Sequence, residues 1–159
     1  MAASAIRIVI DTNTLLRGLV GESSAAVKVL RAAERRLVVP LLSKAVLDEY
    51  RAVLTDKGLM ERFSSLTADL VEVTLRRLRY FGDFVRASNV TFEYRRDPLD
   101  QKFIELAIAL RASHIVSSDK DLLSLPEESS DAGRRFRQRL PGVEVLEAGD
   151  FAKRYLDIT

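Results

Sequence analysis

Cysteine is absent from the 159-residue sequence, and its absence excludes disulfide bonds and metal sites built on thiolates. Histidine is nearly absent as well, since His114 is the only one, so zinc sites that need several histidines are also excluded. Any metal ion must therefore be held mainly by oxygen ligands. A chain without cysteine is also compatible with a reducing compartment.

Long apolar runs are missing too. No uninterrupted apolar stretch approaches the ~20 residues that a transmembrane helix needs. The first ten residues, MAASAIRIVI, lack the basic start and the continuous apolar core of a secretory signal. We therefore expect a cytoplasmic protein that does not interact with a membrane.

Glycine and proline are scarce, at seven and four residues, which argues against a fibrous or linker-rich chain. The hydrophobic content of 47% and the charged content of 30% are typical of globular proteins. A chain of this length buries about two thirds of the surface that it exposes when unfolded, so we expect a single domain spanning residues 1–159. The net charge of +2 and the pI near 9.0 permit nucleic-acid binding but are weak evidence for it.

Short β-branched and apolar runs alternate with helical patterns along most of the chain. The apolar runs predict strands at residues 6–10, 36–42, 114–118 and 143–147, and a further strand at 83–87 or at 89–92. Helical periodicity predicts helices at residues 22–35, 43–55, about 60–81, and 98–112. The polar segment 126–142 is expected to be a mobile loop or a short surface helix. This alternation indicates an α/β fold with a mainly parallel sheet of four to five strands.

Acidic residues follow two of the predicted strands directly. Asp11 comes after residues 6–10, and Asp119 and Asp121 come just after the strand that contains Ile115. The carboxyl ends of parallel strands meet at one edge of a sheet, which is where α/β proteins usually bind ligands. We therefore expect these carboxylates to lie close together.

Two predicted helices add further acids. On a helical projection from Pro98, Asp100 lies in line with the apolar Phe103, Ile104 and Ala107 and not on the polar side, where Lys102 lies. In the helix at 43–55, Glu49 lies at the edge of the inward-facing stripe, whereas Asp48 faces away from it.

Four carboxylates, those of Asp11, Glu49, Asp100 and Asp119, are thus directed toward one region. Acids held close together cannot all stay ionised unless a cation compensates them. Hard oxygen ligands select Mg²⁺ or Mn²⁺. One such ion, or two about 3.5–4 Å apart, would activate water and stabilise the charge of an in-line attack on a phosphodiester.

Simpler structural roles are open for each acid. The segments DTN, DPLD and SSDKDLL all suit helix starts, in which Asp11, Asp97, Asp100 or Asp119 would be capping residues. Glu49 alone would be an ordinary surface acid. The combination favours a site, because capping requires neither Asp100 within an apolar stripe nor acids after two separate strands.

These residues, in this order, resemble the PIN-domain ribonucleases, particularly the toxins of prokaryotic type II toxin–antitoxin systems. VIDTNTLLRGL is similar to the opening strand of that family and its Asp-x-Asn signature, and LDEY matches the place of a helical Glu. RDPLDQKFIELAIALRASHIVSSDKDLL is similar to the acidic helix start, the strand and the Thr-Gly-Asp-like turn of the family. The resemblance covers residues 6 to 151.

The resemblance implies a three-layer α/β/α fold and an Mg²⁺- or Mn²⁺-dependent ribonuclease with Asp11, Glu49, Asp100 and Asp119 as metal ligands. Asn13 would orient Asp11 or a bound water, Ser117 would take the role of the Thr in the turn, and Asp97 and Asp121 would lie behind the ligands. Ser118 departs from the family pattern, which has Gly there, and would narrow the approach to the metal or be tolerated. The resemblance also implies an RNA substrate, a cognate antitoxin and a homodimer.

Basic residues flank the predicted acidic region. These residues could contact phosphates on either side of the cleft, or form ordinary ion pairs on a solvated surface. They are Arg95, Arg96, Arg134, Arg135, Arg137 and Arg139. His114 has no nucleophile pattern around it, so a structural role is expected.

Three functions are compatible with the sequence. The first is a metal-dependent endoribonuclease. The second is a phosphatase like the haloacid dehalogenases, with Asp11 as nucleophile, although such enzymes normally carry a second Asp where this chain has Asn13. The third is a PIN-like domain that binds nucleic acid or a partner with little turnover.

Overall fold

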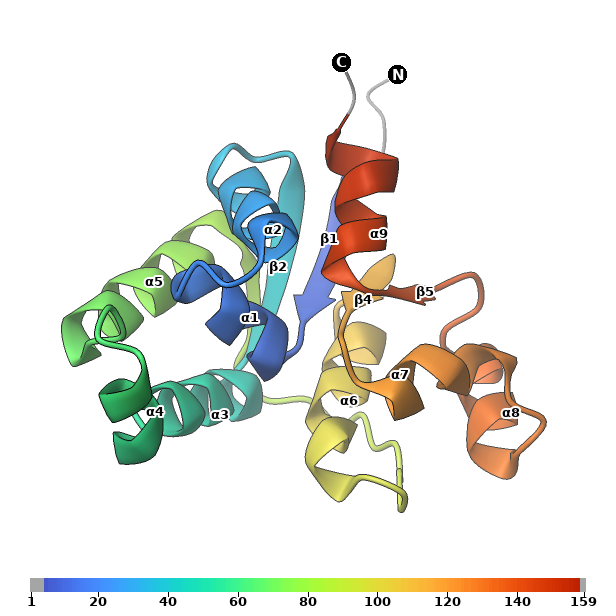
Figure 1. The fold of residues 1–159 in the computed structure, drawn as a ribbon. Helices are drawn as coiled ribbons and strands as arrows, with labels where there is room; N and C mark the ends of the chain where they lie inside the picture. The colour runs from blue at the N-terminus through green and yellow to red at the C-terminus, as the bar shows by residue number, and fades with distance from the viewer. Residues whose placement is uncertain (1–4, 158–159) are drawn as a thin grey trace.

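The computed structural model describes residues 5–157 and contains, within them, a five-stranded sheet. The strands are β1 (Ile6–Ile10), β2 (Val38–Ser43), β3 (Asp83–Val85), β4 (His114–Val116) and β5 (Glu144–Leu146). Their order across the sheet is β3-β2-β1-β4-β5, and every neighbouring pair is parallel (Figure 1). The prediction of an α/β fold with a parallel sheet of four to five strands is confirmed.

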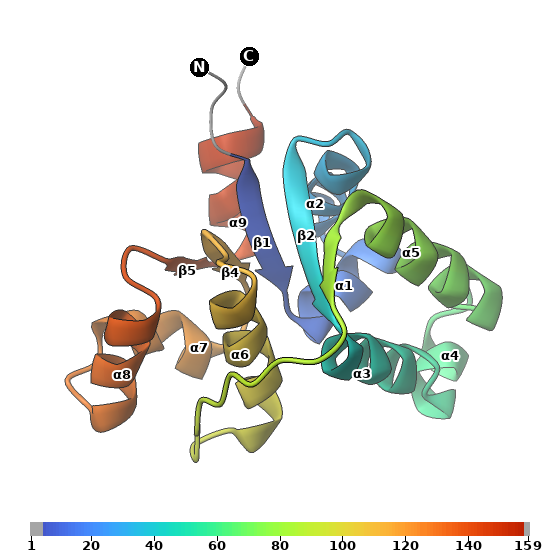
Figure 2. The same ribbon diagram turned by 180° about the vertical axis from the view of Figure 1, so that it is seen from behind.

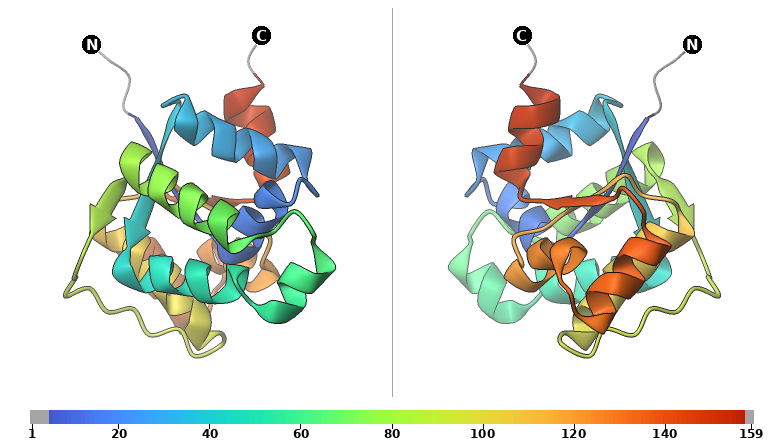
Figure 3. Two further views of the ribbon diagram at one scale, coloured as in Figure 1. Left: turned by 90° about the vertical axis from the view of Figure 1, so that its left-hand side faces the viewer. Right: turned by 90° about the vertical axis from the view of Figure 1, so that its right-hand side faces the viewer.

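Helices cover both faces of this sheet and make the predicted three layers. On one face lie α2 (Ser24–Glu34), α5 (Ala68–Phe81) and α9 (Ala148–Phe151), which continues as a turn of π-helix over Ala152–Leu156. On the other face, α6 (Gln101–Ala109) packs against β1, β2 and β4 (Figure 2). Figure 3 shows the two remaining sides, with α5 in front in one view and α8 in front in the other.

The remaining helices lie toward the carboxyl ends of the strands (Figure 1). They are α1 (Thr12–Leu19), α3 (Lys44–Leu54), α4 (Lys57–Arg62), α7 (Lys120–Ser124) and α8 (Asp131–Arg139), with 3₁₀ turns at Pro98–Asp100 and Leu125–Glu127. No helix within residues 5–157 has the length and apolar character needed to cross a membrane.

The central strand β1 determines where the first acidic residue lies. Ile8, Val9 and Ile10 are at most 2% exposed, because helices cover both faces of the sheet, and this explains the nearly continuous apolar run. Ile10 is in register with Val116 of β4, so the two strands end at the same level. The backbone N–H of Asp11 then donates to the carbonyl oxygen of Val116 at 3.0 Å, which brings the acids that follow both strands to one edge.

The predicted helix at about 60–81 is wrong in its middle. Instead of one helix the chain forms α4 and α5, with an extended Phe63 (φ −117°, ψ 101°) at the end of α4. The side-chain oxygen of Thr67 accepts a hydrogen bond from the N–H of Leu70 at 3.1 Å and starts α5. Serine and threonine compete with helical hydrogen bonds in this way, which apolar periodicity does not register.

Other boundaries differ less. The helix expected at 98–112 begins as a 3₁₀ turn and becomes α-helical at Gln101, and Arg111 just after it has a positive φ of 55°. Of the two alternatives for the additional strand, 83–87 is correct, as β3, and 89–92 is wrong. Segment 126–142 contains the surface helix α8, which Ser130 caps by accepting from the N–H of Gly133 at 3.1 Å. Helix α1 was not among the helices expected from periodicity, although DTN was interpreted as a possible helix start with Asp11 as its cap.

Candidate active site

A cleft of about 260 Å³ opens at the carboxyl edge of β1 and β4. Its walls come from the start of α1, from α3, from the turn before α6 and from the loop between β4 and α7. The residues that line it are Asp11, Thr12, Asn13, Glu49, Asp100, Phe103, Ser118 and Asp119. The four carboxylates that were expected to converge thus line one cavity in the structure.

Asp11 is held in one orientation by protein donors. Its Oδ1 accepts from the backbone N–H of Thr14 at 2.8 Å, and its Oδ2 accepts from the hydroxyl of Ser117 at 2.6 Å and from the N–H of Ser118 at 3.2 Å. The residue is only 6% exposed. Its orientation is therefore fixed before any ligand enters the cleft.

Glu49 reaches the cleft from α3 and has two partners. Its Oε2 accepts from the hydroxyl of Thr12 at 2.5 Å, and its Oε1 pairs with Nζ of Lys102 at 2.7 Å. The neighbouring Tyr50 hydroxyl donates to the carbonyl oxygen of Ile10 and ties α3 to the end of β1. Neither Thr12 nor Lys102 was expected at the site, because they lie 37 and 53 positions from Glu49 and no local pattern links them to it.

Asp100 is the acid with the least compensation. Its Oδ2 is buried and has no hydrogen-bond partner among the described residues. Burial, together with the nearby charges of Asp97 and Asp119, raises the pKa of Asp100 to about 8. One carboxylate oxygen from each of Asp97, Asp100 and Asp119 lies within 4.8 Å of the other two. We call these three residues the aspartate triad.

The capping interpretation applies to some of these acids. Asp11 caps α1, Asp97 accepts from the N–H of Leu99 at 3.2 Å, and Asp119 accepts from the N–H groups of Asp121 and Leu122 at 2.8 and 3.3 Å. Asp100 makes no such bond. Capping and lining the cleft are therefore compatible roles for the same side chain, and among these four aspartates Asp100 is the one that capping does not explain.

Asn13 and Ser118 form a contact that the sequence did not predict. The amide Nδ2 of Asn13 donates to the hydroxyl of Ser118 at 2.9 Å, so Asn13 is connected to Asp11 through Ser118 and not directly. Ser117, which is completely buried, also accepts from the N–H of Asp119 at 3.0 Å and so links both strand-end acids. Ser118, in place of the expected Gly, thus adds a polar contact at the mouth of the cleft.

Asp121 and the predicted arginines lie outside the residues that line the cleft. Arg96 pairs with Glu128 at 2.6 Å and lies 3.6 Å from Asp121, while Arg95 pairs with Glu93 at 2.7 Å. On α8, the arginines contact Asp131 or carbonyl oxygens of neighbouring segments, and they are Arg134, Arg135, Arg137 and Arg139. Each of the six arginines therefore has an intramolecular partner.

His114 also lies away from the cleft. It is 7% exposed, and its ring nitrogens contact the hydroxyls of Ser113 at 2.9 Å and Tyr155 at 3.0 Å. Burial lowers its pKa. These contacts are consistent with the structural role expected for it.

A divalent cation fits the chemistry of the cleft. The aspartate triad offers converging carboxylate oxygens, and the buried Oδ2 of Asp100 has no donor of its own. All acids around the cleft supply hard oxygen ligands, which suit Mg²⁺ or Mn²⁺. Asp97, expected behind the ligands, is part of this closest group, whereas Asp11 and Glu49 line the same cleft outside it.

Comparison with known proteins gives one family. The family model described as PIN domain matches residues 7–121, which include every residue that lines the cleft. No curated protein and no solved structure matches the chain.

Proposed function

Since this chain belongs to the PIN-domain family, whose members are generally nucleases, we propose that it is a metal-dependent endoribonuclease. The cofactor would be Mg²⁺ or Mn²⁺, held in the cleft that Asp11, Glu49, Asp100 and Asp119 line, with Asp97 beside the last two. The observation that carries the proposal is the buried, unpartnered Oδ2 of Asp100 beside Asp97 and Asp119. An acid in this position is stable in its ionised form only beside a cation.

The cation would supply charge that lowers the pKa of water and stabilises the phosphorane-like transition state. The residues of the chain keep the site ready for it. Ser117 and the N–H of Ser118 fix the direction of Asp11, and Thr12 fixes Glu49. Asn13 holds Ser118 at the mouth of the cleft, where it limits how the RNA backbone enters. Fixed carboxylates of this kind reduce the reorganisation needed during reaction.

The test is cleavage of single-stranded RNA by the purified protein with Mn²⁺. We expect cleavage that EDTA abolishes, and loss of at least about 100-fold in rate for Asp11→Asn and Asp100→Asn, in line with losses when a charge-stabilising group is removed. Asp150→Asn is the matched control, because Asp150 is exposed on α9 and does not line the cleft. Metal-independent cleavage, or full activity of both cleft variants, would exclude the proposal.

The same experiment separates the alternatives. A PIN-like binding module would retain RNA without cutting it at any Mn²⁺ concentration. A phosphatase would form an aspartyl-phosphate on Asp11, which mass spectrometry detects. The residue two positions after Asp11 is the amide Asn13, bonded to Ser118, and it cannot serve as the general acid of such an enzyme.

We further propose a toxin role with RNA as target, a cognate antitoxin and a homodimeric state. The support is the resemblance of the motifs around Asp11, Glu49 and Asp119 to those of PIN-domain toxins. Induced expression of the chain should arrest growth of a bacterial host, and Asp100→Asn should not. Light scattering of the purified protein should give twice the chain mass of 17.8 kDa. Normal growth with active enzyme present would exclude the toxin role, and a monomer mass would exclude the dimer.

A further inference from the structure

Lys102 connects α6 to α3 at the edge of the cleft. Its Nζ lies 2.7 Å from Oε1 of Glu49, and the two side chains are only 26% and 15% exposed. The second oxygen of Glu49 already accepts from the hydroxyl of Thr12. A partly buried ion pair is screened less by solvent than a surface pair. Lys102 therefore holds Glu49 more firmly than an exposed lysine would.

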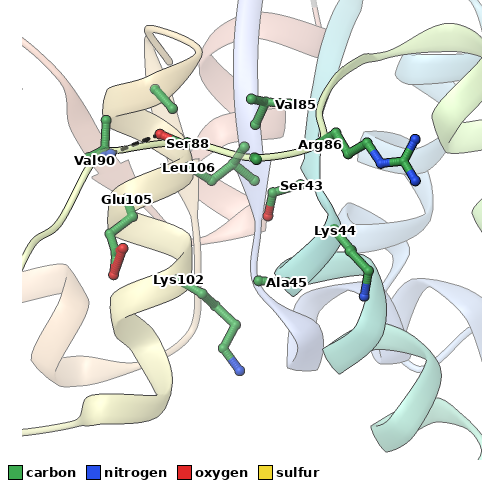
Figure 4. Close-up of a pocket in the computed structure, with 12 residues that line it drawn as sticks. Ser43, Lys44, Ala45, Val85, Arg86, Ser88, Val90, Lys102, Glu105 and Leu106 are labelled. Carbon is green, nitrogen blue, oxygen red and sulfur yellow. Dashed lines mark hydrogen bonds between the residues drawn. The ribbon is translucent and has the colours of Figure 1, made fainter.

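The path of the lysine side chain is also constrained. Lys102 lines a small pocket of about 140 Å³ between α3 and α6, next to Ala45 and Leu106. Figure 4 shows Lys102 extending from α6 into the gap between the two helices, whereas Lys44 lies along α3 and Arg86 points away from the gap. Lys44 pairs with Asp48 on its own helix at 2.8 Å, and its side chain is 68% exposed. Lys102 is therefore the basic side chain of this pocket that neutralises an acid of the cleft.

The aspartate triad has no such partner. None of the ion pairs formed within residues 5–157 involves Asp97, Asp100 or Asp119. The charges of the cleft are thus divided into two parts. Glu49 is balanced by an ammonium group of the protein, whereas the triad depends on a cation from solution.

We propose that Lys102 is the resident counter-ion of Glu49 and that the site consequently takes one divalent cation per chain, at the aspartate triad. The inference deepens the proposed function and rests on its metal dependence. A second divalent cation at Glu49 would have to displace Lys102 or lie next to its ammonium group. Two positive charges side by side repel each other strongly where solvent is partly excluded. The lysine thus provides the positive charge that a second metal would otherwise bring.

The number of Mn²⁺ ions bound by the full chain, counted by equilibrium dialysis, tests this inference without reference to activity. We expect one ion for the wild type, one for Lys102→Arg and two for Lys102→Met, which keeps the stem but removes the charge. Lys102→Met combined with Glu49→Gln should return to one. Lys28→Met is the matched control, because Lys28 pairs with Asp157 on the surface at 2.9 Å and should leave the number at one.

Two ions in the wild type would overturn the inference and leave a metal-dependent nuclease intact. A single ion in folded Lys102→Met would also overturn it, because the lysine would then exclude nothing. Circular dichroism checks that Lys102→Met is folded. If it is not folded, the number of ions bound by the wild type alone tests the proposal of one cation per chain. No bound ion in the wild type would remove both the inference and the metal dependence of the proposed function, which distinguishes the two failures.

Discussion

At the scale of the residue, the cleft consists of acids whose environments differ. Asp11 accepts hydrogen bonds from three donors, and Glu49 accepts from one hydroxyl and pairs with one ammonium group. Asp100 has one oxygen with no donor among the described residues. The protein therefore compensates the charges of these acids to different degrees. Asp100, the least compensated, is the acid through which the folding stability should respond to pH and to metal.

Asp100 should make the free energy of unfolding of the metal-free protein depend on pH. Burial and the neighbouring charges of Asp97 and Asp119 raise its pKa from an ordinary value of 3.8 to about 8, so the folded chain retains a proton that the unfolded chain loses. The folded state binds more protons between these values, and its free energy of unfolding in EDTA should therefore fall as the pH rises through that interval. Asp100→Asn should show a weaker fall, measured by urea denaturation. Identical slopes for both proteins would contradict this assignment.

Ser117 joins the two strand ends through one hydroxyl. It donates to Asp11 at 2.6 Å and accepts from the N–H of Asp119 at 3.0 Å, with no exposed surface. Ser117→Ala should lower the free energy of unfolding by about 1–3 kcal/mol, because two buried polar groups lose their partner. The same variant should weaken Mn²⁺ binding in titration calorimetry. Ser117→Thr, which keeps the hydroxyl, is the control and should lose less on both measures.

At the scale of the element, the carboxyl edge of the sheet is formed by helices that begin at strand ends. The first residue after β1 caps α1, Ser43 at the end of β2 caps α3, and Asp119 after β4 caps α7. Short connections of this kind leave little freedom in how each helix leaves the sheet. The positions of Asp11, Glu49 and Asp119 relative to one another therefore depend on strand register more than on loop conformation.

Gly82 shows how closely one such element packs. It ends α5, and a Cβ atom placed on it would lie 2.1 Å from the carbonyl oxygen of Pro40 in β2 and 2.7 Å from that of Leu78. Gly82→Ala should lower the free energy of unfolding by about 1–3 kcal/mol, since backbone atoms must move to admit the methyl group. Gly149→Ala is the matched control, because a Cβ there meets nothing within 4 Å. Equal thermal midpoints for the two variants would contradict the packing argument.

At the scale of the whole molecule, the arginines differ in whether they contact the protein backbone or extend into solvent. On α8, Arg135 donates to the carbonyl oxygen of Glu93 at 2.8 Å and stacks over Phe92, while Arg137 donates to the carbonyl oxygens of Pro126 and Glu128. These arginines hold α8 against its neighbouring segments. Arg95 and Arg134 are more exposed, at 87% and 63% of the side chain, and we propose them as the phosphate contacts.

The salt dependence of RNA binding tests this division. In EDTA, Arg95→Gln and Arg134→Gln should each reduce the slope of log affinity against log salt by about 0.7, the value for one phosphate contact on a single strand. Arg137→Gln should instead lower the free energy of unfolding, because its guanidinium bonds to backbone. Arg154→Gln, far along the chain and paired with Glu144, is the control. Unchanged slopes for Arg95 and Arg134 would exclude them as phosphate contacts.

Much of the fold could be predicted from the sequence, because the deciding signals are local. β-Branched runs buried on both faces predict parallel strands, and the acids that follow residues 6–10 and Val116 must reach the same edge once those strands are parallel. The position of Asp100 within an apolar stripe was likewise visible from helical periodicity. The break between α4 and α5 was not predicted, because it depends on side-chain capping at Thr67 and not on the spacing of apolar residues.

The sequence by itself determined the parallel sheet, the edge at which the acids gather and the oxygen-only chemistry of any metal site. Only the tertiary structure decided which acids pair with protein groups and which are left for a cation. Lys102 and Glu49 are 53 positions apart, and Asn13 and Ser118 are 105 apart. Contacts of that kind depend on the distance and angle between packed helices and loops, which no local pattern contains. The division of charge in the cleft is therefore a property of the folded molecule.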